Sequence, residues 1–253
     1  MSNLKFAAVS LLLDAAGSSR VDLVFDNMSN LEAGNPDAKI TSTASTPNTF
    51  MRGAYNLVSG TTAITGFDVF PVNLSGTAYG HLKISIFVWG SVNLGTVNAT
   101  TPAFGNLLGN YSFTSAGTFN SGFYYNYEGS PVGVNPGISL GSPLAIPSTQ
   151  IGLTFNIQGS TDGGLNYLSV NSLTSLISYS NSVSVGSQVF NGYYRNANSE
   201  VNGNFTSLLR SLSQQNQSLS VRVFGDVSVV PEPGIVALAG LGGAALLIFR
   251  RRK

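Results

Sequence analysis

The chain contains no cysteine, and it has a single histidine among its 253 residues. A disulfide framework and thiol chemistry are therefore excluded, and so are the usual cysteine and histidine ligand sets of zinc sites. The lone histidine, His81, would need a nucleophile and an orienting acid beside it to act in a catalytic triad. The segment 137–141 (GISLG) has the G-x-S-x-G spacing, but turn clusters flank it instead of the strand and helix of a nucleophile elbow, and we expect His81 to be a solvent-contacting residue at the start of a strand.

Charged residues are also scarce, at 9% of the chain, whereas an average soluble domain has about 25%. Of the 12 basic residues, four stand at positions 250–253, so the rest of the chain has 8 basic against 11 acidic residues and a net charge of −3. This balance offers no basic surface for nucleic acid. We therefore predict no nucleic-acid partner. Asn, Ser, Thr and Gly supply most of the polarity instead.

The few carboxylates show no catalytic pattern. Glycosidases need two of them about 5 to 9.5 Å apart, and no local pair with a cleft-like setting occurs, although two distant ones could meet in the fold. We therefore predict that the protein is not an enzyme and keep a hydrolase with a site built from distant loops as a competing hypothesis. The carboxylates of the body are Asp22, Asp26, Glu32, Asp37, Asp68, Glu128, Asp162, Glu200 and Asp226.

Calcium is the one cofactor for which the sequence offers oxygen ligands. Asp22 and Asp26 stand near Asn27, and Asp162 stands near Thr161 and Asn166; carboxylate and amide oxygens are what calcium prefers. No D-x-[DN]-x-[DN]-G loop is present. We therefore expect these residues to form structural turns and the protein to need no cofactor, with calcium as the alternative.

Hydrophobic residues alternate with a period of two along most of the body. In 82–89 (LKISIFVW), Leu82, Ile84, Ile86 and Val88 would face one way and Lys83, Ser85, Phe87 and Trp89 the other, and 151–158 (IGLTFNIQ) alternates likewise. Such alternation is typical of strands with a buried face. The segment 159–164 (GSTDGG) followed by 165–170 predicts a Gly-rich hairpin. Further strands are expected at 63–69, 111–114, 122–127, 183–194 and 219–224, and one helix at 201–212.

Turn clusters such as NPG at 135–137 and GSP at 141–143 separate these segments. About ten short strands at this spacing favour two packed sheets over an α/β fold. We therefore predict an all-β fold, with a single antiparallel β-sandwich or jelly-roll-like domain over residues 20–226 and a C-terminal transmembrane helix beyond it.

Two tyrosine clusters give the only hint of a binding surface. Exposed tyrosines stack on sugar rings and add a hydroxyl, but aromatic residues also suit strands and fill sandwich cores. We favour the core interpretation and keep glycan binding as the alternative. The tyrosines concerned are Tyr124, Tyr125, Tyr127, Tyr193 and Tyr194.

The last 24 residues form a three-part tail. A proline-bracketed acid is followed by the apolar run 235–249 and then by four cations. As a helix, these 15 apolar residues would span about 22 Å, whereas a bilayer core of about 30 Å usually needs about 20 residues. The prolines resist helical continuation and leave an extended segment upstream, and the positive-inside rule places the cations in the cytoplasm. The motif residues are Val230, Pro231, Glu232, Pro233 and Gly234, and the basic stop is Arg250, Arg251, Arg252 and Lys253.

This order of motif, apolar run and basic stop resembles the PEP-CTERM sorting signal of Gram-negative bacteria, with an ordinary short anchor as the alternative. The resemblance implies that a membrane-embedded exosortase recognises Pro231-Glu232-Pro233 and processes the tail, which holds the precursor in the inner membrane until then. The opening VDLVFDNMSN at 21–30 also resembles the first strand of extracellular domains that precede such tails. It implies an exported β-sandwich and no activity.

Export requires a signal, and the N-terminus offers one at residues 1–19. Lys5, the apolar run 6–13 and the small residues Ala15-Ala16-Gly17 are in the expected order, although a first strand or helix of the domain is the alternative. We thus expect three regions, namely a signal peptide at 1–19, the β-sandwich at 20–226 and the sorting tail at 227–253. The predicted function is a structural or adhesive protein of the envelope or extracellular matrix. The alternative is a lectin-like module that binds exopolysaccharide.

Overall fold

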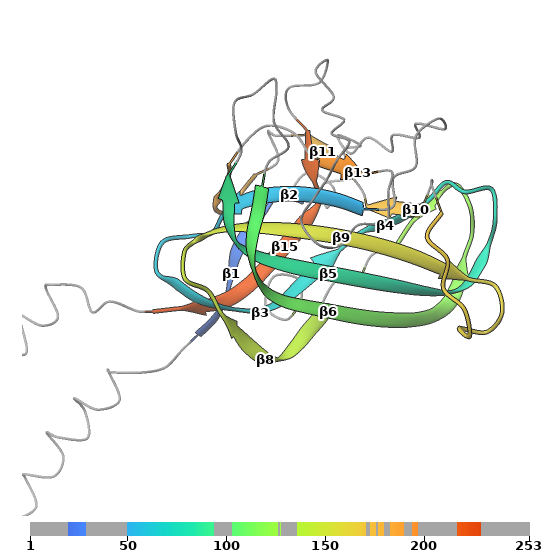
Figure 1. The fold of residues 1–253 in the computed structure, drawn as a ribbon, viewed down its shortest axis with the longest axis horizontal. Coiled ribbons are helices and arrows are strands. Elements are labelled where there is room, and N and C mark those ends of the chain that lie inside the picture. The colour runs from blue at the N-terminus through green and yellow to red at the C-terminus, as the bar shows by residue number, and fades with distance from the viewer. Residues whose placement is uncertain are drawn as a thin grey trace, which may run out of the picture. The chain divides into compact units, whose positions relative to one another are not determined.

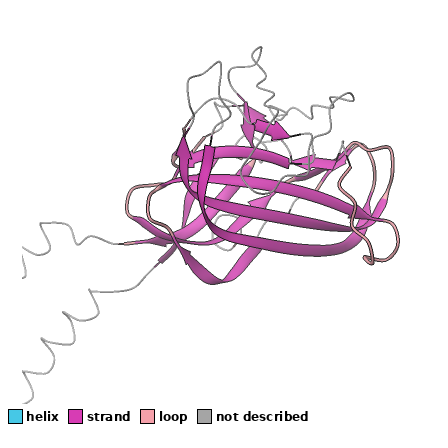
Figure 2. Ribbon diagram, viewed as in Figure 1, coloured by secondary structure: helices cyan, strands magenta, loops and turns pink. Residues whose placement is uncertain are grey.

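The computed structural model contains strands and no helix in the part of the chain that it describes. The described residues are 20–28, 50–93, 103–125, 127, 136–170, 173–175, 177–179, 183–189, 194–196 and 217–228. Figure 2 shows these residues without a helix. The strand pairs whose register is defined are antiparallel. The predicted all-β antiparallel class is therefore confirmed, while the predicted helices at 201–212 and 235–249 lie outside the described residues.

Two main sheets, which we call the large sheet and the four-stranded sheet, carry the longest strands (Figure 1). The four-stranded sheet has the order β1 (Arg20–Asp26), β15 (Val221–Val227), β3 (Thr61–Val69) and β8 (Ile138–Ala145). The large sheet has the order β12 (Ser187–Gln188), β2 (Phe50–Asn56), β9 (Gln150–Ser160), β5 (Tyr79–Asn93) and β6 (Ala103–Phe119), and β13 (Tyr194–Asn196) also pairs with β2.

Two small sheets complete the described strands. One joins β10 (Leu173–Ser175), β4 (Pro71–Asn73) and β7 (Phe123–Tyr124), and the other joins β11 (Ile177–Tyr179) to β14 (Gln217–Leu219). The strands fall in a compact unit that runs from Val21 to Val227.

The main hydrophobic core draws side chains from both main sheets, which is the arrangement of a β-sandwich. The alternation predicted for 82–89 and 151–158 places one set of side chains in this core. The large sheet contributes Ile84, Ile86, Val88, Leu153 and Phe155, and the four-stranded sheet contributes Ile64, Phe67, Val69, Val221 and Val223.

The other face of the large sheet is also buried in part, around an arginine. Phe87 and Trp89, the alternate residues of β5, pack with Phe50, Ala54 and Phe104 in a second cluster. The guanidinium carbon of Arg52 lies 5.1 Å from the ring centre of Trp89 and 4.8 Å from that of Phe104. Arg52 is fully buried, and this burial lowers its pKa. The contacts combine apolar packing with cation–π attraction, so this face is not simply a solvent face.

The predicted elements differ from the structure at several places. The strand predicted at 183–194 is reduced, in its described part, to the two-residue β12 and to Tyr194 of β13. The segment 165–170 forms only one bridge, between Gly159 and Leu168, and its Leu165 and Leu168 are 83% and 65% exposed. The cluster 141–143, predicted as a turn, lies inside β8. Pro143 is tolerated there because β8 is the edge of its sheet, where a backbone donor is dispensable.

Thr154 provides a test of the second cluster. Its hydroxyl accepts hydrogen bonds from Arg52 Nε and Trp89 Nε1, both 2.9 Å long. Thr154→Val would leave two buried donors without this acceptor, and we expect the free energy of unfolding to fall by about 2–4 kcal/mol. Urea unfolding followed by the fluorescence of Trp89, the one tryptophan of the chain, measures the change.

Thr65→Val is the matched control. The Thr65 hydroxyl is buried and has no hydrogen-bond partner among the described residues, so its removal should change the stability by less than about 0.5 kcal/mol or increase it. Equal losses in the two variants would contradict the role given to Thr154.

Candidate functional site

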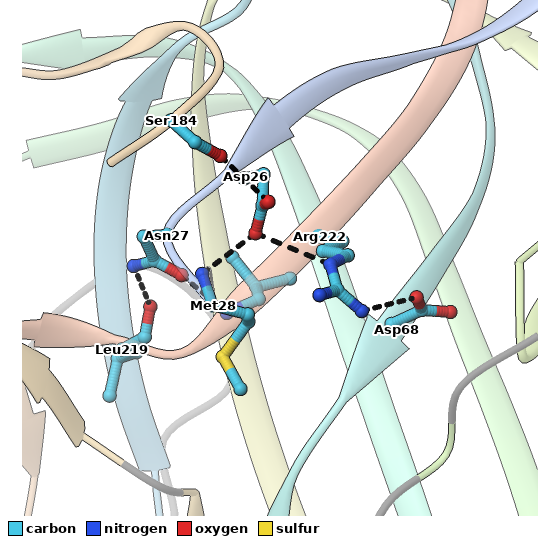
Figure 3. A network of polar contacts seen from close by, with 8 residues as sticks. Asp26, Asn27, Met28, Asp68, Ser184, Leu219 and Arg222 are labelled. Carbon is cyan, nitrogen blue, oxygen red and sulfur yellow. Dashed lines mark hydrogen bonds and ion pairs between the residues drawn. The ribbon is translucent and has the colours of Figure 1, made fainter. Parts of the chain in front are cut away.

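A buried arginine brings two carboxylates together, as Figure 3 shows. Arg222 in β15 and Asp68 in β3 are direct cross-strand partners, with Arg222 Nη1 3.6 Å from Asp68 Oδ2. On its other side, Arg222 Nε lies 3.3 Å from Asp26 Oδ1 at the end of β1. All three residues are buried. We call them the Arg222 network.

The carboxylates of the Arg222 network also bind groups of the chain itself. Asp26 accepts hydrogen bonds of 2.7 Å from the Met28 backbone and from the Ser184 hydroxyl, and Asp68 accepts one of 2.7 Å from the Gly137 backbone. Two distant carboxylates thus do meet in the fold, but a general acid or base must reach the substrate. These two are enclosed and matched to a guanidinium, so their arrangement is structural.

Asn27 extends this arrangement along the strand. Its side-chain amide donates to the Leu219 carbonyl at 2.8 Å and accepts from the Val221 backbone at 2.9 Å. Asn27 is completely buried. The Asp-Asn pair of the opening segment therefore fastens the end of β1 to the start of β15. The sequence pattern indicated only a turn here, because the partners lie more than 190 positions away.

The second calcium candidate is a turn held by its own carboxylate. Asp162 Oδ1 accepts from the Ser160 hydroxyl at 2.5 Å and from the backbones of Leu165 and Asn166 at 3.1 and 3.0 Å. Asp162 Oδ2 accepts from the Asn166 side-chain nitrogen at 2.7 Å. Gly163 and Gly164 supply the positive φ angles of 77° and 85° that the turn needs. These bonds engage the oxygens within the turn, as the structural interpretation predicts.

No group of three or more potential metal-binding side chains (His, Cys, Asp or Glu) occurs within the described residues. In the first calcium candidate, Asp26 belongs to the Arg222 network. The amide oxygen of Asn27 accepts from Val221. The calcium hypothesis therefore has no assembled ligand set in this part of the chain.

A small cavity lies between β6 and the start of β8. Its volume is about 240 Å³, below the roughly 300–1,000 Å³ typical of small-molecule sites, so it suits only a small ligand. Burial raises the pKa of Tyr127 in its wall. Hydroxyl groups and apolar side chains share the lining, which consists of Ile84, Phe113, Thr114, Ser115, Tyr127, Gly137, Ile138 and Ser139.

The structure disperses the predicted tyrosines. Tyr127 lines the cavity, whereas Tyr125 packs its ring on Phe119 at 4.9 Å and donates a hydrogen bond of 3.1 Å to the Asn120 carbonyl. Tyr124 pairs with Val72 between β7 and β4, Tyr194 pairs with Arg52 between β13 and β2, and Tyr193 lies outside the described residues. Among the described residues of these clusters, Tyr127 is the tyrosine that lines this cavity.

Two further residues lie near each other at the turn that follows β9, and one of them was singled out from the sequence. His81 is partly exposed near the start of β5, as predicted, and its ring stands beside the turn at Gly164. Tyr167 was missed, since 165–170 was predicted to be a strand. Its ring lies 5.9 Å from Lys83 Nζ, over the large sheet.

Residues 229–253 match the family model for the PEP-CTERM protein-sorting motif. The fold and the tail together define an exported β-protein with a C-terminal sorting signal. More specifically, the chain carries a PEP-CTERM motif, which targets an exported protein to a membrane-embedded exosortase. The resemblance found in the sequence is thereby confirmed for the tail. No curated protein and no solved structure matched the chain.

The predicted motif residues 230–234, the apolar run at 235–249 and the basic stop 250–253 fall within the matched segment. These residues and the predicted signal peptide at 1–19 lie outside the described residues. Within the described residues, the search for an apolar helix long enough to cross a bilayer found none.

The hydrogen bonds to Asp162 predict its titration. They favour the charged carboxylate and lower its pKa, the Ser160 bond most, relative to the ordinary value of about 3.9. The turn is therefore stabilised above about pH 4 and loses this contribution as the pH falls through the lowered pKa. Carboxyl-carbon NMR should show Asp162 titrating well below pH 3.9.

Ser160→Ala should raise this midpoint, because it removes the largest contribution to the shift. Ser148→Ala is the matched control, since the Ser148 hydroxyl serves a different turn through the Gln150 backbone. An ordinary midpoint in the wild-type protein would refute the hydrogen-bonded turn.

Proposed function

We propose that this chain is a non-catalytic structural or adhesive protein that is exported, inserted in the inner membrane as a precursor, processed by exosortase and retained in the outer envelope or extracellular matrix. The observation that carries the proposal is the sorting motif at 229–253 behind a β-sandwich whose described buried charges serve its own strands. The tail supplies the sorting signal. The body is poor in charged residues.

The absence of a catalytic role is supported by the placement of the titratable groups. Asp26 and Asp68 are locked to Arg222, and Asp162 is bound by its own turn. Among the described residues, the cavity lining consists of hydroxyl and apolar residues and includes no carboxylate, histidine or lysine. General acid–base catalysis needs such a group in hydrogen-bond reach of the substrate.

Transient anchoring is supported by the dimensions of the tail. A helix of 15 apolar residues spans about 22 Å against a bilayer core of about 30 Å, so it makes a weak permanent anchor. The cations at 250–253 would hold its end in the cytoplasm. Pro231 and Pro233 would keep the cleavage segment extended for a protease-like cleft.

Fractionation of the producing cells tests the sorting. The Pro231→Ala/Pro233→Ala variant should accumulate in the inner membrane at full length, because the motif for processing is lost. A chain that lacks residues 231–253 should leave the membrane fraction altogether. The measurement is an immunoblot of inner-membrane, outer-membrane and medium fractions.

Pro147→Ala is the control for proline loss, since Pro147 is exposed between β8 and β9. It should fractionate as the wild-type protein does. If the chain without residues 231–253 stays in the same membrane fraction as the wild type, the sorting proposal fails.

A second candidate function is glycan binding at the cavity. The observation that favours it is the placement of Tyr127, with the hydroxyl residues Thr114, Ser115 and Ser139, around one concave site. A tyrosine ring with neighbouring hydroxyl groups can contact both the apolar face and the hydroxyls of a sugar. The volume limits this site to about one sugar unit or a chain end.

Sedimentation of the full chain with exopolysaccharide of the producing cells tests this candidate. Tyr127→Ala should reduce the bound fraction about tenfold or more, as expected for a lost stacking contact together with a lost hydrogen bond. Tyr125→Phe should bind normally, because the Tyr125 hydroxyl serves the Asn120 carbonyl. Equal binding by all three proteins, or no binding by the wild type, would contradict a glycan site here.

A further inference from the structure

Strand β6 forms an open edge of the large sheet. It runs over 17 residues, Ala103–Phe119, and its sole strand partner in the described structure is β5. From position 105 to 118 no residue is buried, and Leu107 is 47% exposed. An edge strand presents a row of unpaired backbone donors and acceptors to any strand that approaches.

The sequence of β6 lacks the charges and prolines that often protect such an edge. It reads AFGNLLGNYSFTSAGTF, without a charged residue or a proline. Short length, charged side chains and prolines are what usually discourage edge-to-edge pairing. A long strand without them remains able to accept a further strand.

The other edges of the two main sheets do carry protection. Strand β8 contains Pro143, and β1 contains Arg20 and Asp22. At the far edge of the large sheet, β12 and β13 are two and three residues long. The protection is therefore missing at one of the four described edges.

A bulge limits the part of β6 that can pair regularly. Asn106 has a φ of 57°, and the register with β5 shifts between Val88 and Trp89, opposite Gly109 and Leu107. Beyond this irregularity the register is continuous from Gly109 to Ala116. The centre of the regular stretch is close to Ser112.

This stretch is complementary to itself. Tyr111 and Phe113 pack against the main core, while Asn110, Ser112 and Thr114 are exposed. In an antiparallel pair centred on Ser112, Tyr111 of one copy would stand opposite Phe113 of the other. Asn110 would stand opposite Thr114. Such a pair matches aromatic with aromatic and polar with polar residues, both of which stabilise a sheet.

We propose that β6 is an assembly edge, at which a second copy of this chain pairs antiparallel about Ser112 and joins the two large sheets. The contact is isologous, because the same strand is used by both copies, so the assembly closes as a dimer. The protected edges prevent growth into a fibre. The inference deepens the proposed structural role and rests on it only for the location of the dimer outside the cell.

Single cysteines test the register, because the chain has none of its own. In the full exported chain, Ser112→Cys should form an intermolecular disulfide under mild oxidation, since residues opposite each other have Cβ atoms about 4.5–5.5 Å apart. A non-reducing gel detects the dimer. Ser142→Cys is the control, at an exposed position of the protected edge strand β8, and should remain monomeric. Equal yields of dimer at the two positions would overturn the proposal.

Lysines test the association itself. Ser112→Lys would place two like charges opposite each other at the centre of the pair, which is destabilising. Light scattering of the purified full chain should give twice the protomer mass for the wild type and for Ser142→Lys, and about half that mass for Ser112→Lys. Any association through the tail is common to all three. A monomeric wild type, or a Ser112→Lys variant that stays dimeric, would refute the pairing.

The same variants separate this inference from the proposed function. Export and fractionation depend on the tail, so Ser112→Lys should reach the same cell fraction as the wild type while losing the dimer. A wild-type protein that dimerises but never leaves the membrane would support pairing at β6 and contradict the sorting proposal. A correctly sorted protein that is monomeric would contradict pairing at β6 and support the sorting proposal.

Discussion

Arg222 and its two aspartates fix the relation between three strands of the four-stranded sheet. The guanidinium lies between Asp68 on β3 and Asp26 at the end of β1, and Asp26 and Asp68 in turn bind backbone amides of the neighbouring segments. Removing one member of such a buried set typically costs about 3–5 kcal/mol, although an apolar replacement of the whole set can be neutral. The network therefore specifies one arrangement of the strands more than it adds to overall stability. It also reaches the cavity, because Asp68 holds Gly137 in the cavity wall.

The scarcity of charge has opposite effects inside and outside this domain. Inside, Arg52 and Arg222 are completely buried, and each guanidinium has a specific environment, aromatic for Arg52 and acidic for Arg222. Outside, few charges remain to keep strand edges apart. Elsewhere a proline, charges or short length protects an edge, but β6 has none of these. A chain with 9% charged residues thus uses its described buried charges to position strands and leaves one described edge open to association.

The sequence was sufficient for features that depend on local pattern. Period-two alternation identified β5 and β9, and the spacing of the strands identified an all-β fold with two packed sheets. The tail was identified because its three parts are contiguous. The sequence failed where a partner lies far away in the chain. Asp26 pairs with Arg222 across 196 positions, so no local signal marks Asp26 as part of a network. The segment 165–170 follows a Gly-rich turn, as the second strand of a hairpin would, but it forms only one bridge and its Leu165 and Leu168 stay exposed.

The two surfaces proposed for recognition are adjacent, and this has a geometric consequence. Thr114 and Ser115 belong to β6 and also line the cavity. In a two-fold pair about Ser112 the axis is perpendicular to the sheet, so both cavities would lie on the same side of the joined sheets. Ser115 stands three residues from the axis on each copy, which places the two cavities about 20 Å apart at roughly 3.4 Å per residue. Two weak sites held at a fixed spacing bind a repeating polymer more tightly than either does alone. Dimerisation at β6 would therefore convert a cavity too small for strong binding into half of a bivalent site.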